Sequence, residues 1–335
     1  MNSRTTLWGL IGSFGIAIAT ANADVTVDKM FSDHMVLQRE MKVPVWGTAA
    51  PQEEVTVSFH GQAKTAQADA EGKWLVKLDP LKVQDAGELS VKGKSNEVKF
   101  KDVLVGEVWI GSGQSNMAGG AGGYARNDEV LAKSITDGPY PTLRLYGRGQ
   151  WAVADENTMR PFSAIHFSFG LALHQELKIP VGLMFGAVGG TPSGRWLSQE
   201  MAEADPKFVA MFKKNNGMDL SEIKALREKK LAEYNEIKKK AVAEGKKPPR
   251  FRAPPLLGDL YKGKIEYMAP YAVRGVLWDQ GESKTQVPGV DQFTTMTALI
   301  NGWRSVWGQD FHFLHVQKPS GGVAPFDPSN PINKG

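Results

Sequence analysis

Small polar residues collect at four places in this sequence, each directly after an apolar run. The four segments are GSGQSN at 111–116, GGTPSGRW at 189–196, DQGES at 279–283 and KPSGG at 318–322. In the first segment, Ser115 could attack a carbonyl carbon if a base removed its hydroxyl proton. The tetrahedral intermediate would then need hydrogen-bond donors aimed at its oxyanion. These residue types therefore point to acyl transfer.

The other segments could supply the donors and a carboxylate. Gly189 and Gly190 would let backbone N–H groups approach a substrate closely, because glycine has no side chain. Gln280 offers a side-chain amide, and Glu282 could orient a histidine or a substrate hydroxyl. A histidine base for Ser115 is not evident from the sequence.

Other catalytic motifs do not occur. The segment around Ser115 is not G-x-S-x-G, and it lacks the third glycine of a dinucleotide fingerprint. The chain has no P-loop string, no H-E-x-x-H string and no cysteine. His166 and His174 lie on one predicted helix without an obvious carboxylate partner, so a structural role is the favoured interpretation.

The composition and the N-terminus indicate an exported protein. Residues 1–23 combine Arg4, an apolar stretch and Ala21-Asn22-Ala23, which is the pattern of a secretory signal peptide. The stretch is shorter than the roughly 20 residues of a membrane span, and no other run reaches that length. An exported chain without cysteine suits a bacterial periplasm or exterior.

The basic character of the chain is local. The net charge is +4, yet residues 211–252 alone hold 13 Lys and Arg against 6 Asp and Glu. Because the charge is confined to one segment, nucleic acid is not an expected partner.

Residues 24–102 alternate apolar and polar positions, as half-buried strands do. The strongest examples are EEVTVSF at 53–59 and KWLVKL at 73–78, and Glu71-Gly72 is one of several turn signals. Short strands at this spacing predict a small β-sandwich or jelly roll as an N-terminal accessory domain.

From residue 103 to 335, apolar strands alternate with amphipathic helices, which predicts an α/β domain with a parallel sheet. Strands are expected at 103–110, 142–147, 181–188, 272–278 and 311–317, and helices at 163–178 and 290–307. The residues expected to face inward are Ile165, Phe169, Leu173 and Leu177 in the first helix, and Phe293, Met296, Ile300, Trp303 and Trp307 in the second. Because ligands bind at the carboxyl ends of such strands, the four polar segments should share one sheet edge.

A helical insertion is expected at about 200–252. Asp219 to Glu222 resembles a capping box, and Gly245 with Pro248-Pro249 ends the segment, so 220–244 is predicted to be one long Lys-rich helix. A solvated helix that covers the domain is favoured over a lid that closes on the substrate.

Several segments resemble one esterase family. VGEVWIGSGQSNM at 105–117 closely resembles the nucleophile block of the sialate O-acetylesterase family, which belongs to the SGNH-type serine esterases. VGGTPSGRW at 188–196 resembles its second block and VRGVLWDQGES at 273–283 its third. FSDHMVLQRE, VPVWG and GKWLVKLDPL look like its split accessory β domain. The resemblance runs from about Met30 to Gln317.

This resemblance implies a flavodoxin-like SGNH hydrolase core of three α/β/α layers. Ser115 matches the nucleophile, and its backbone N–H would join the oxyanion hole with that of Gly189 or Gly190. Gln280 stands where the family has a polar group near the oxyanion, and Glu282 matches the acidic residue of the third block. The resemblance implies an O-acetylated carbohydrate substrate and neither a metal nor an organic cofactor.

The chain departs from the family pattern in two respects. The family places its catalytic histidine in an Asp-x-x-His block after the last core strand, whereas Asp327 has no histidine after it. An incomplete chain is the favoured interpretation, and a lost or relocated base is the other. His315 is the nearest candidate, although its place in a strand favours packing. Asp279 and Lys284 stand where the family usually has Tyr and Asn, which leaves the acetylated sugar open.

The leading hypothesis is a secreted esterase that removes acetyl groups from a carbohydrate through an acetyl-enzyme on Ser115. The alternative is a catalytically impaired carbohydrate-binding pseudoenzyme, because the histidine block is absent. Arg195 and Trp196 are candidate substrate contacts, with a surface charge and core packing as the respective alternatives. The sequence does not predict an oligomeric state.

Overall fold

The computed structural model describes residues 24–147, 149–250, 257–280 and 282–316. The predicted signal peptide and the KPSGG segment lie outside these residues. Within the described part of the chain, no helix is both long and apolar enough to cross a membrane.

The N-terminal residues form a β-sandwich, as the alternating pattern predicts. Its strands are β1 (Thr26–Val27), β3 (Val43–Thr48) and β6 (Lys73–Leu78) in one sheet, and β4 (Glu54–Phe59), β5 (Gln62–Gln67) and β7 (Gly87–Lys92) in the other. The alternate apolar residues of β4 and β6 are buried between the sheets. Gly72 makes the turn before β6 at φ 77, where a Cβ atom would lie 2.6 Å from the Ala49 carbonyl oxygen.

One strand connects the sandwich to the rest of the protein. Strand β8 (Glu97–Gly113) has 17 residues and merges two segments that the sequence pattern predicts as separate strands. Its first part pairs with β7, residues 104–106 pair with β2 (Val36–Gln38), and the remainder enters the α/β core. The predicted domain boundary at 102/103 therefore lies inside a strand, beside Asp102, whose φ is 54°.

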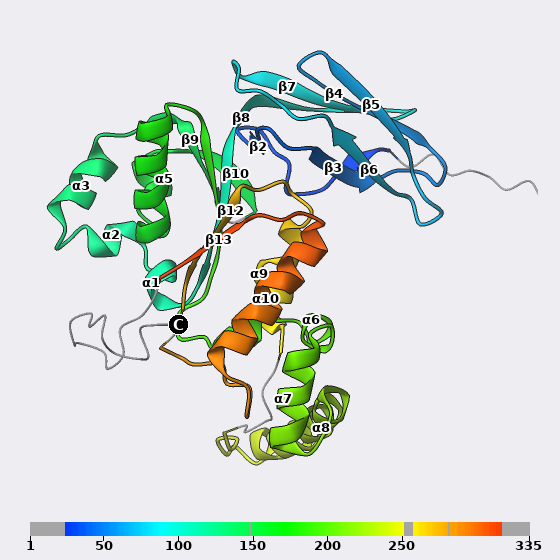
Figure 1. The fold of residues 1–335 in the computed structure, drawn as a ribbon, viewed down its shortest axis with the longest axis vertical. Helices are drawn as coiled ribbons and strands as arrows, with labels where there is room; N and C mark the ends of the chain where they lie inside the picture. The colour runs from blue at the N-terminus through cyan, green and yellow to red at the C-terminus, as the bar shows by residue number, and fades with distance from the viewer. Residues whose placement is uncertain (1–23, 148, 251–256, 281, 317–335) are drawn as a thin grey trace, which may run out of the picture.

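The α/β core is built around the second half of β8. Its strands lie in the order β10 (Gln150–Ala154), β9 (Tyr140–Gly147), β11 (Val181–Ala187), β8, β12 (Gly275–Asp279) and β13 (His312–His315). All these pairs are parallel except β10 with β9. Strand β8 lies between β11, on the side of β9 and β10, and β12, on the side of β13 (Figure 1). Such a switch point places ligands at the carboxyl end of the central strand.

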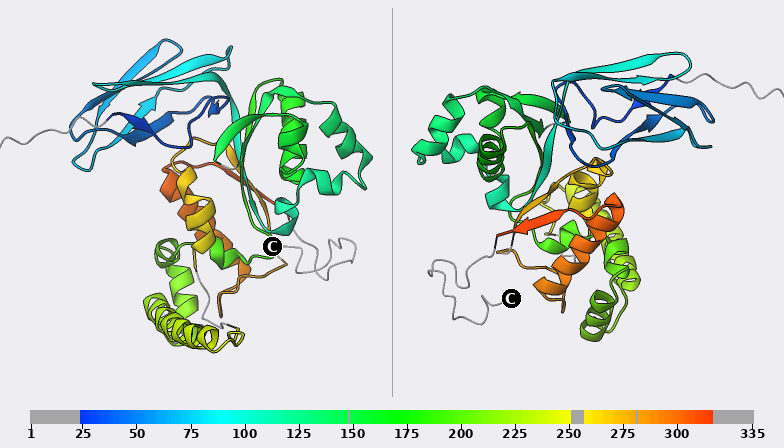
Figure 2. Two further views of the ribbon diagram at one scale, coloured as in Figure 1. Left: turned by 180° about the vertical axis from the view of Figure 1, so that it is seen from behind. Right: turned by 45° about the horizontal axis from the view of Figure 1, so that its top comes forward.

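Helices cover both faces of this sheet (Figures 1 and 2). One face carries α1 (Ser115–Ala118), α2 (Ala121–Tyr124), α3 (Glu129–Thr136), α4 (Glu156–Met159) and α5 (Ala164–Leu177). The other carries α9 (Asp259–Lys264), the short η2 (Glu266–Met268) that follows it, and α10 (Gln292–Trp307). Because both faces are covered, residues 103–113 of β8 are all buried.

The predicted inward stripe of α5 is half right, because Phe169 and Leu173 pack against the core but the two end positions do not. Ile165 and Leu177 are exposed, whereas the neighbouring positions His166, Phe167, Gly170 and Leu171 are buried. Gly170 explains the rotation, since a Cβ atom there would lie 2.4 Å from Leu183 of β11. The helix thus approaches the sheet through its smallest residue.

The inward face of α10 is correct except at its start. Trp303 and Trp307 are buried, but Phe293 is 70% exposed in the first turn. Its ring lies under the ammonium of Lys207, at 5.0 Å from the ring centroid, in a cation–π contact.

The insertion is helical, as predicted. It contains η1 (Ser193–Trp196), α6 (Gln199–Glu203), α7 (Pro206–Asn216) and α8 (Leu220–Ala243). Asp219 and Glu222 form the predicted capping box, and Leu220 is the one buried residue of α8. Figure 1 shows α8 beside α7 and away from the sheet. The helix is thus solvated, but it does not cover the domain.

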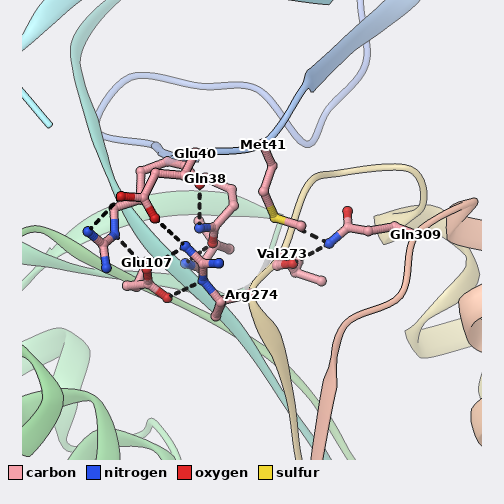
Figure 3. A network of polar contacts seen from close by, with 9 residues as sticks. Gln38, Glu40, Met41, Glu107, Val273, Arg274 and Gln309 are labelled. Carbon is pink, nitrogen blue, oxygen red and sulfur yellow. Dashed lines mark hydrogen bonds and ion pairs between the residues drawn. The ribbon is translucent and has the colours of Figure 1, made fainter. Parts of the chain in front are cut away.

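A charged cluster holds the N-terminal segment against the core (Figure 3). Glu107 of β8 is 3% exposed and accepts hydrogen bonds from Arg39, at 2.6 Å, and from Arg274, at 2.8 and 3.0 Å. Glu40, which is exposed, contacts the same two arginines. Burial alone would raise the pKa of Glu107, but the two guanidinium groups hold it below its usual value.

Candidate active site

The carboxyl ends of three neighbouring strands bring the polar segments together. In the core sheet, Gly113 of β8 lies opposite Ala187 of β11 and opposite Asp279 of β12. The segments that begin near 111, 189 and 279 therefore leave the same edge, as the sequence predicts. The fourth segment falls outside the described residues.

A tight turn at the end of β8 presents Ser115. Gly113 has φ 124, and a Cβ atom there would lie 2.1 Å from the Asp279 carbonyl oxygen, so only glycine fits. The next N–H, of Gln114, donates to that carbonyl oxygen at 2.8 Å. Ser115 is exposed and is the first residue of the short helix α1.

Gly189 lies beside Ser115. A Cβ atom at Gly189 would be 3.7 Å from the Ser115 Cα atom and 3.8 Å from its Cβ atom. Gly190 has φ 69 and has no atom near the equivalent position. Of the two glycines that the sequence leaves open, Gly189 is thus the one next to the nucleophile candidate.

Two carboxylates hold the residues on either side of Ser115. The Gln114 amide donates to Glu282. The Asn116 amide contacts Asp279 at 3.4 Å and Glu282 at 3.5 Å. Glu282 therefore contacts the nucleophile segment itself, a connection that the sequence pattern misses. Gln114 and Asn116 are not among the site residues predicted from the sequence, although their positions on either side of Ser115 could have indicated such a role.

Gln280 is part of the scaffold between the loops. It is buried, and its Nε2 donates to the carbonyl oxygens of Thr191, at 3.3 Å, and Lys284, at 3.1 Å. Its Oε1 accepts from Gln292 at 3.1 Å. Both amide hydrogens are thus engaged, and this network would have to open before Gln280 could donate to an oxyanion. That role stays a prediction.

The two candidate substrate contacts of the second block are engaged within the protein. Trp196 is fully buried and packs edge-on against Trp278, with centroids 5.9 Å apart. Core packing therefore accounts for Trp196, and the expected sugar contact is wrong because no face of the ring is open. The guanidinium of Arg195 pairs with both oxygens of Asp259.

None of the six histidines hydrogen-bonds to Ser115, and all six lie among the described residues. His34 pairs with Asp102 at 2.6 Å, and His174 with Thr142 at 2.7 Å. His315 is exposed on β13, so the expected packing role is wrong. His166 is fully buried below Gly111, and neither of its ring nitrogens has a hydrogen-bond partner.

His166 is expected to make the protein sensitive to acid. Burial lowers its pKa from 6.5 to about 3, so the unfolded chain takes up the proton first. Neutral His166 makes its full contribution to the free energy of unfolding above pH 6.5, and this contribution is lost as the pH falls toward 3. His166→Leu should flatten the decline of unfolding free energy over this range by up to roughly 1.4 kcal/mol per pH unit.

Urea denaturation at several pH values measures this effect. The matched control is a leucine substitution of the exposed His315. Equal pH slopes for His166→Leu and wild type would contradict the structural reading of His166.

Among the described residues, no group of three or more His, Cys, Asp or Glu side chains could hold a metal ion. The groups that surround Ser115 are instead backbone N–H groups, amides and the carboxylates of Asp279 and Glu282.

Comparison with known proteins agrees with this geometry. Residues 105–226, which include Ser115 and Gly189, match the family model described as carbohydrate esterase, sialic acid-specific acetylesterase. Sialate O-acetylesterase from Mus musculus is 26% identical over 314 residues, and that from Homo sapiens is 24% identical over 313. These alignments cover 84% and 82% of this chain, and the chain spans about half the length of the relatives, 55% and 52%.

The fold has a solved counterpart. A carbohydrate acetylesterase from Xanthomonas citri superimposes with a TM-score of 0.66 at 25% identity, over 90% of this chain and 62% of that chain. The match extends through the β-sandwich as well as the α/β core, because it covers nearly the whole described chain. The strand-end geometry, the match over residues 105–226 and this shared architecture make the chain similar to carbohydrate acetylesterases, including the sialate O-acetylesterases.

Proposed function

We propose that the protein hydrolyses acetyl esters of a carbohydrate, with Ser115 as the nucleophile. The observation that carries this proposal is the exposed Ser115 at the end of the central strand, directly beside Gly189. The N–H groups of a first helical turn lack partners within the helix. The N–H of Ser115 is therefore available for the oxyanion of a tetrahedral intermediate, and the N–H of Gly189, which has no acceptor among the described residues, would be the second donor.

The reaction would proceed in two steps. The Ser115 oxygen attacks the acetyl carbonyl carbon, the sugar hydroxyl leaves with a proton, and an acetyl-enzyme remains. Water then cleaves this ester and releases acetate. The nucleophile must give up its proton to a base, and no histidine of the chain reaches it.

The missing histidine contact supports a second candidate function. A protein that binds an acetylated glycan without turnover would keep the same strand-end architecture and would need no base. We retain this alternative because the geometry around Ser115 supplies donors and carboxylates but no imidazole.

Release of acetate from an O-acetylated oligosaccharide separates the two functions. The esterase predicts release from O-acetyl groups but not from N-acetyl groups of the same glycan. Saturable binding without acetate release, even at high protein concentration, would support the binding protein. If the protein neither releases acetate nor binds the glycan, both functions are excluded.

Glu282 is expected to position the nucleophile segment. Glu282→Ala removes the acceptor of Gln114 and one acceptor of Asn116. Hydrogen bonds to charged groups contribute about 1.5–3 kcal/mol, so kcat should fall by roughly tenfold to a hundredfold with little change in KM. Steady-state kinetics on a small acetyl ester measures this split.

The control for Glu282 is Glu176→Ala, an exposed position on α5. A KM increase at constant kcat in Glu282→Ala would instead assign Glu282 to substrate binding.

We also propose that the protein acts in the periplasm or outside a bacterial cell. The basis is the N-terminal pattern of Arg4, apolar stretch and Ala21-Asn22-Ala23, together with the absence of cysteine from the sequence. Cell fractionation, with N-terminal sequencing of the exported form, tests this location.

A further inference from the structure

A hollow adjoins the nucleophile segment on the side of the sheet that carries α5. It has a volume of about 380 Å³ and is lined by Asn116, Tyr124, Asp128, Leu131, Ala164, Ile165 and Ser168. Asn116 directly follows Ser115 in the chain, so the hollow adjoins the nucleophile segment. None of these lining residues is a candidate site residue in the sequence, where Ile165 is expected in the core, because the structure alone brings α1, α2, α3 and α5 together here.

The apolar part of the lining is unusually open. Tyr124 is 48% exposed and Ile165 is 38% exposed. Gly119 positions the aromatic ring, since a Cβ atom there would lie 2.3 Å from Tyr124 Cε2. An exposed ring beside a nucleophile offers a flat apolar surface, which suits the C–H face of a sugar ring.

The polar part of the lining has free hydrogen-bonding capacity. One Asp128 oxygen caps α3 by accepting from the Leu131 N–H at 2.9 Å, and the other has no partner among the described residues. The Asn116 amide nitrogen is directed to Asp279 and Glu282, which leaves its oxygen as an acceptor. Sugar hydroxyls are donors, and these acceptors match them.

The charged group in the lining of the hollow is negative. Asp128 is the one charged residue of the lining, and Asp279 and Glu282 lie on the other side of Asn116. The guanidinium of Arg195 is held by Asp259, and Arg126 lies in the chain near the hollow without lining it. A sugar that bears its own carboxylate would face like charge here, which opposes binding.

We propose that this hollow is the subsite for the sugar ring that carries the acetyl ester, and that it selects a neutral sugar over an acidic one such as sialate. The ring stacks on Tyr124, its hydroxyls donate to Asp128 and Asn116, and its ester reaches Ser115. The role of the hollow in catalysis rests on the proposed esterase function. The binding of a neutral sugar there does not, and it can be tested separately.

The test compares three esters with the full chain: an O-acetylated neutral hexoside, an O-acetylated sialic acid and ethyl acetate, which has no ring. Tyr124→Ala and Gly119→Ala should lower the ratio of kcat/KM for hexoside over ethyl acetate by about fivefold to tenfold. Gly123→Ala is the matched control, because a Cβ atom there meets nothing within 4 Å. An unchanged ratio in Tyr124→Ala would overturn the subsite.

Asp128→Asn tests the charge separately. Asparagine retains the cap of α3, so folding should be preserved, which thermal melting verifies. The kcat/KM for acetylated sialate relative to the hexoside should rise by about tenfold. A wild type that already prefers sialate, or no relative change in Asp128→Asn, would overturn the selectivity.

Calorimetric titration with the acetylated hexoside distinguishes failure of the proposed function from failure of the subsite. If the wild type cleaves no ester, the esterase proposal fails, yet hexoside binding that weakens in Tyr124→Ala still supports the subsite. No hexoside binding by the wild type, or equal affinity in wild type and Tyr124→Ala, overturns the subsite.

Discussion

Ser115→Ala is expected to lower acetate release by roughly a thousandfold or more, because it removes the atom that forms the acetyl-enzyme. The exposed side chain makes no hydrogen bond within the described residues, so its loss leaves the contacts of Gln114 and Asn116 intact. Folding stability should therefore stay within about 0.5 kcal/mol of wild type. Initial rates on an O-acetylated oligosaccharide measure the effect.

The matched control is Ser134→Ala, which removes an exposed serine of α3. Rapid acid quenching followed by peptide mass spectrometry should locate an acetyl group on the Ser115 peptide of the wild type alone. Equal acetate release by Ser115→Ala and wild type would exclude the serine mechanism, whatever the fate of the carbohydrate subsite.

Glu107→Ala is expected to cost about 3 kcal/mol or more of unfolding free energy. The substitution leaves the guanidinium groups of Arg39 and Arg274 without their buried partner, and breaking a buried pair typically costs about 3–5 kcal/mol. Because Glu107 connects the β2 end of the N-terminal segment to the core, the sandwich should also lose its attachment. Equilibrium denaturation by urea, followed by tryptophan fluorescence, measures both effects.

Glu40→Ala is a sensitive control, because Glu40 contacts the same two arginines but its side chain is 58% exposed. Exposed ion pairs contribute about 0–1 kcal/mol, so this variant should unfold close to wild type. Similar losses in the two variants would show that burial does not decide the strength of this cluster.

The sequence predicts the strand-end segments well because their physical basis is local. Apolar runs followed by glycine and small polar residues mark strand ends, and parallel strands direct those ends to one edge. The contact of Gly189 with Ser115 and the register of Gly113 with Asp279 confirm this arrangement. The long helix at 220–243 was predictable for a similar reason, since its capping box is a local signal.

Predictions of side-chain direction were less successful. Trp196 follows a strand, which suggested an exposed ring, yet η1 turns it into the core against Trp278. The stripe of α5 is wrong at its two ends, Ile165 and Leu177, because Gly170 and not a large apolar residue packs against Leu183 of the sheet. Both depend on packing between segments far apart in the chain.

By itself, the sequence determined the α/β core with its N-terminal β-sandwich, the strand that presents Ser115, and the resemblance to a carbohydrate esterase family. Those properties follow from periodicity and from motifs within single segments. Only the tertiary structure decided that Gly189 rather than Gly190 adjoins Ser115, that Glu282 contacts both neighbours of the nucleophile, and that Tyr124 and Asp128 line a hollow beside it. These relations join residues from different elements, and their distances are fixed by packing, which no local pattern records.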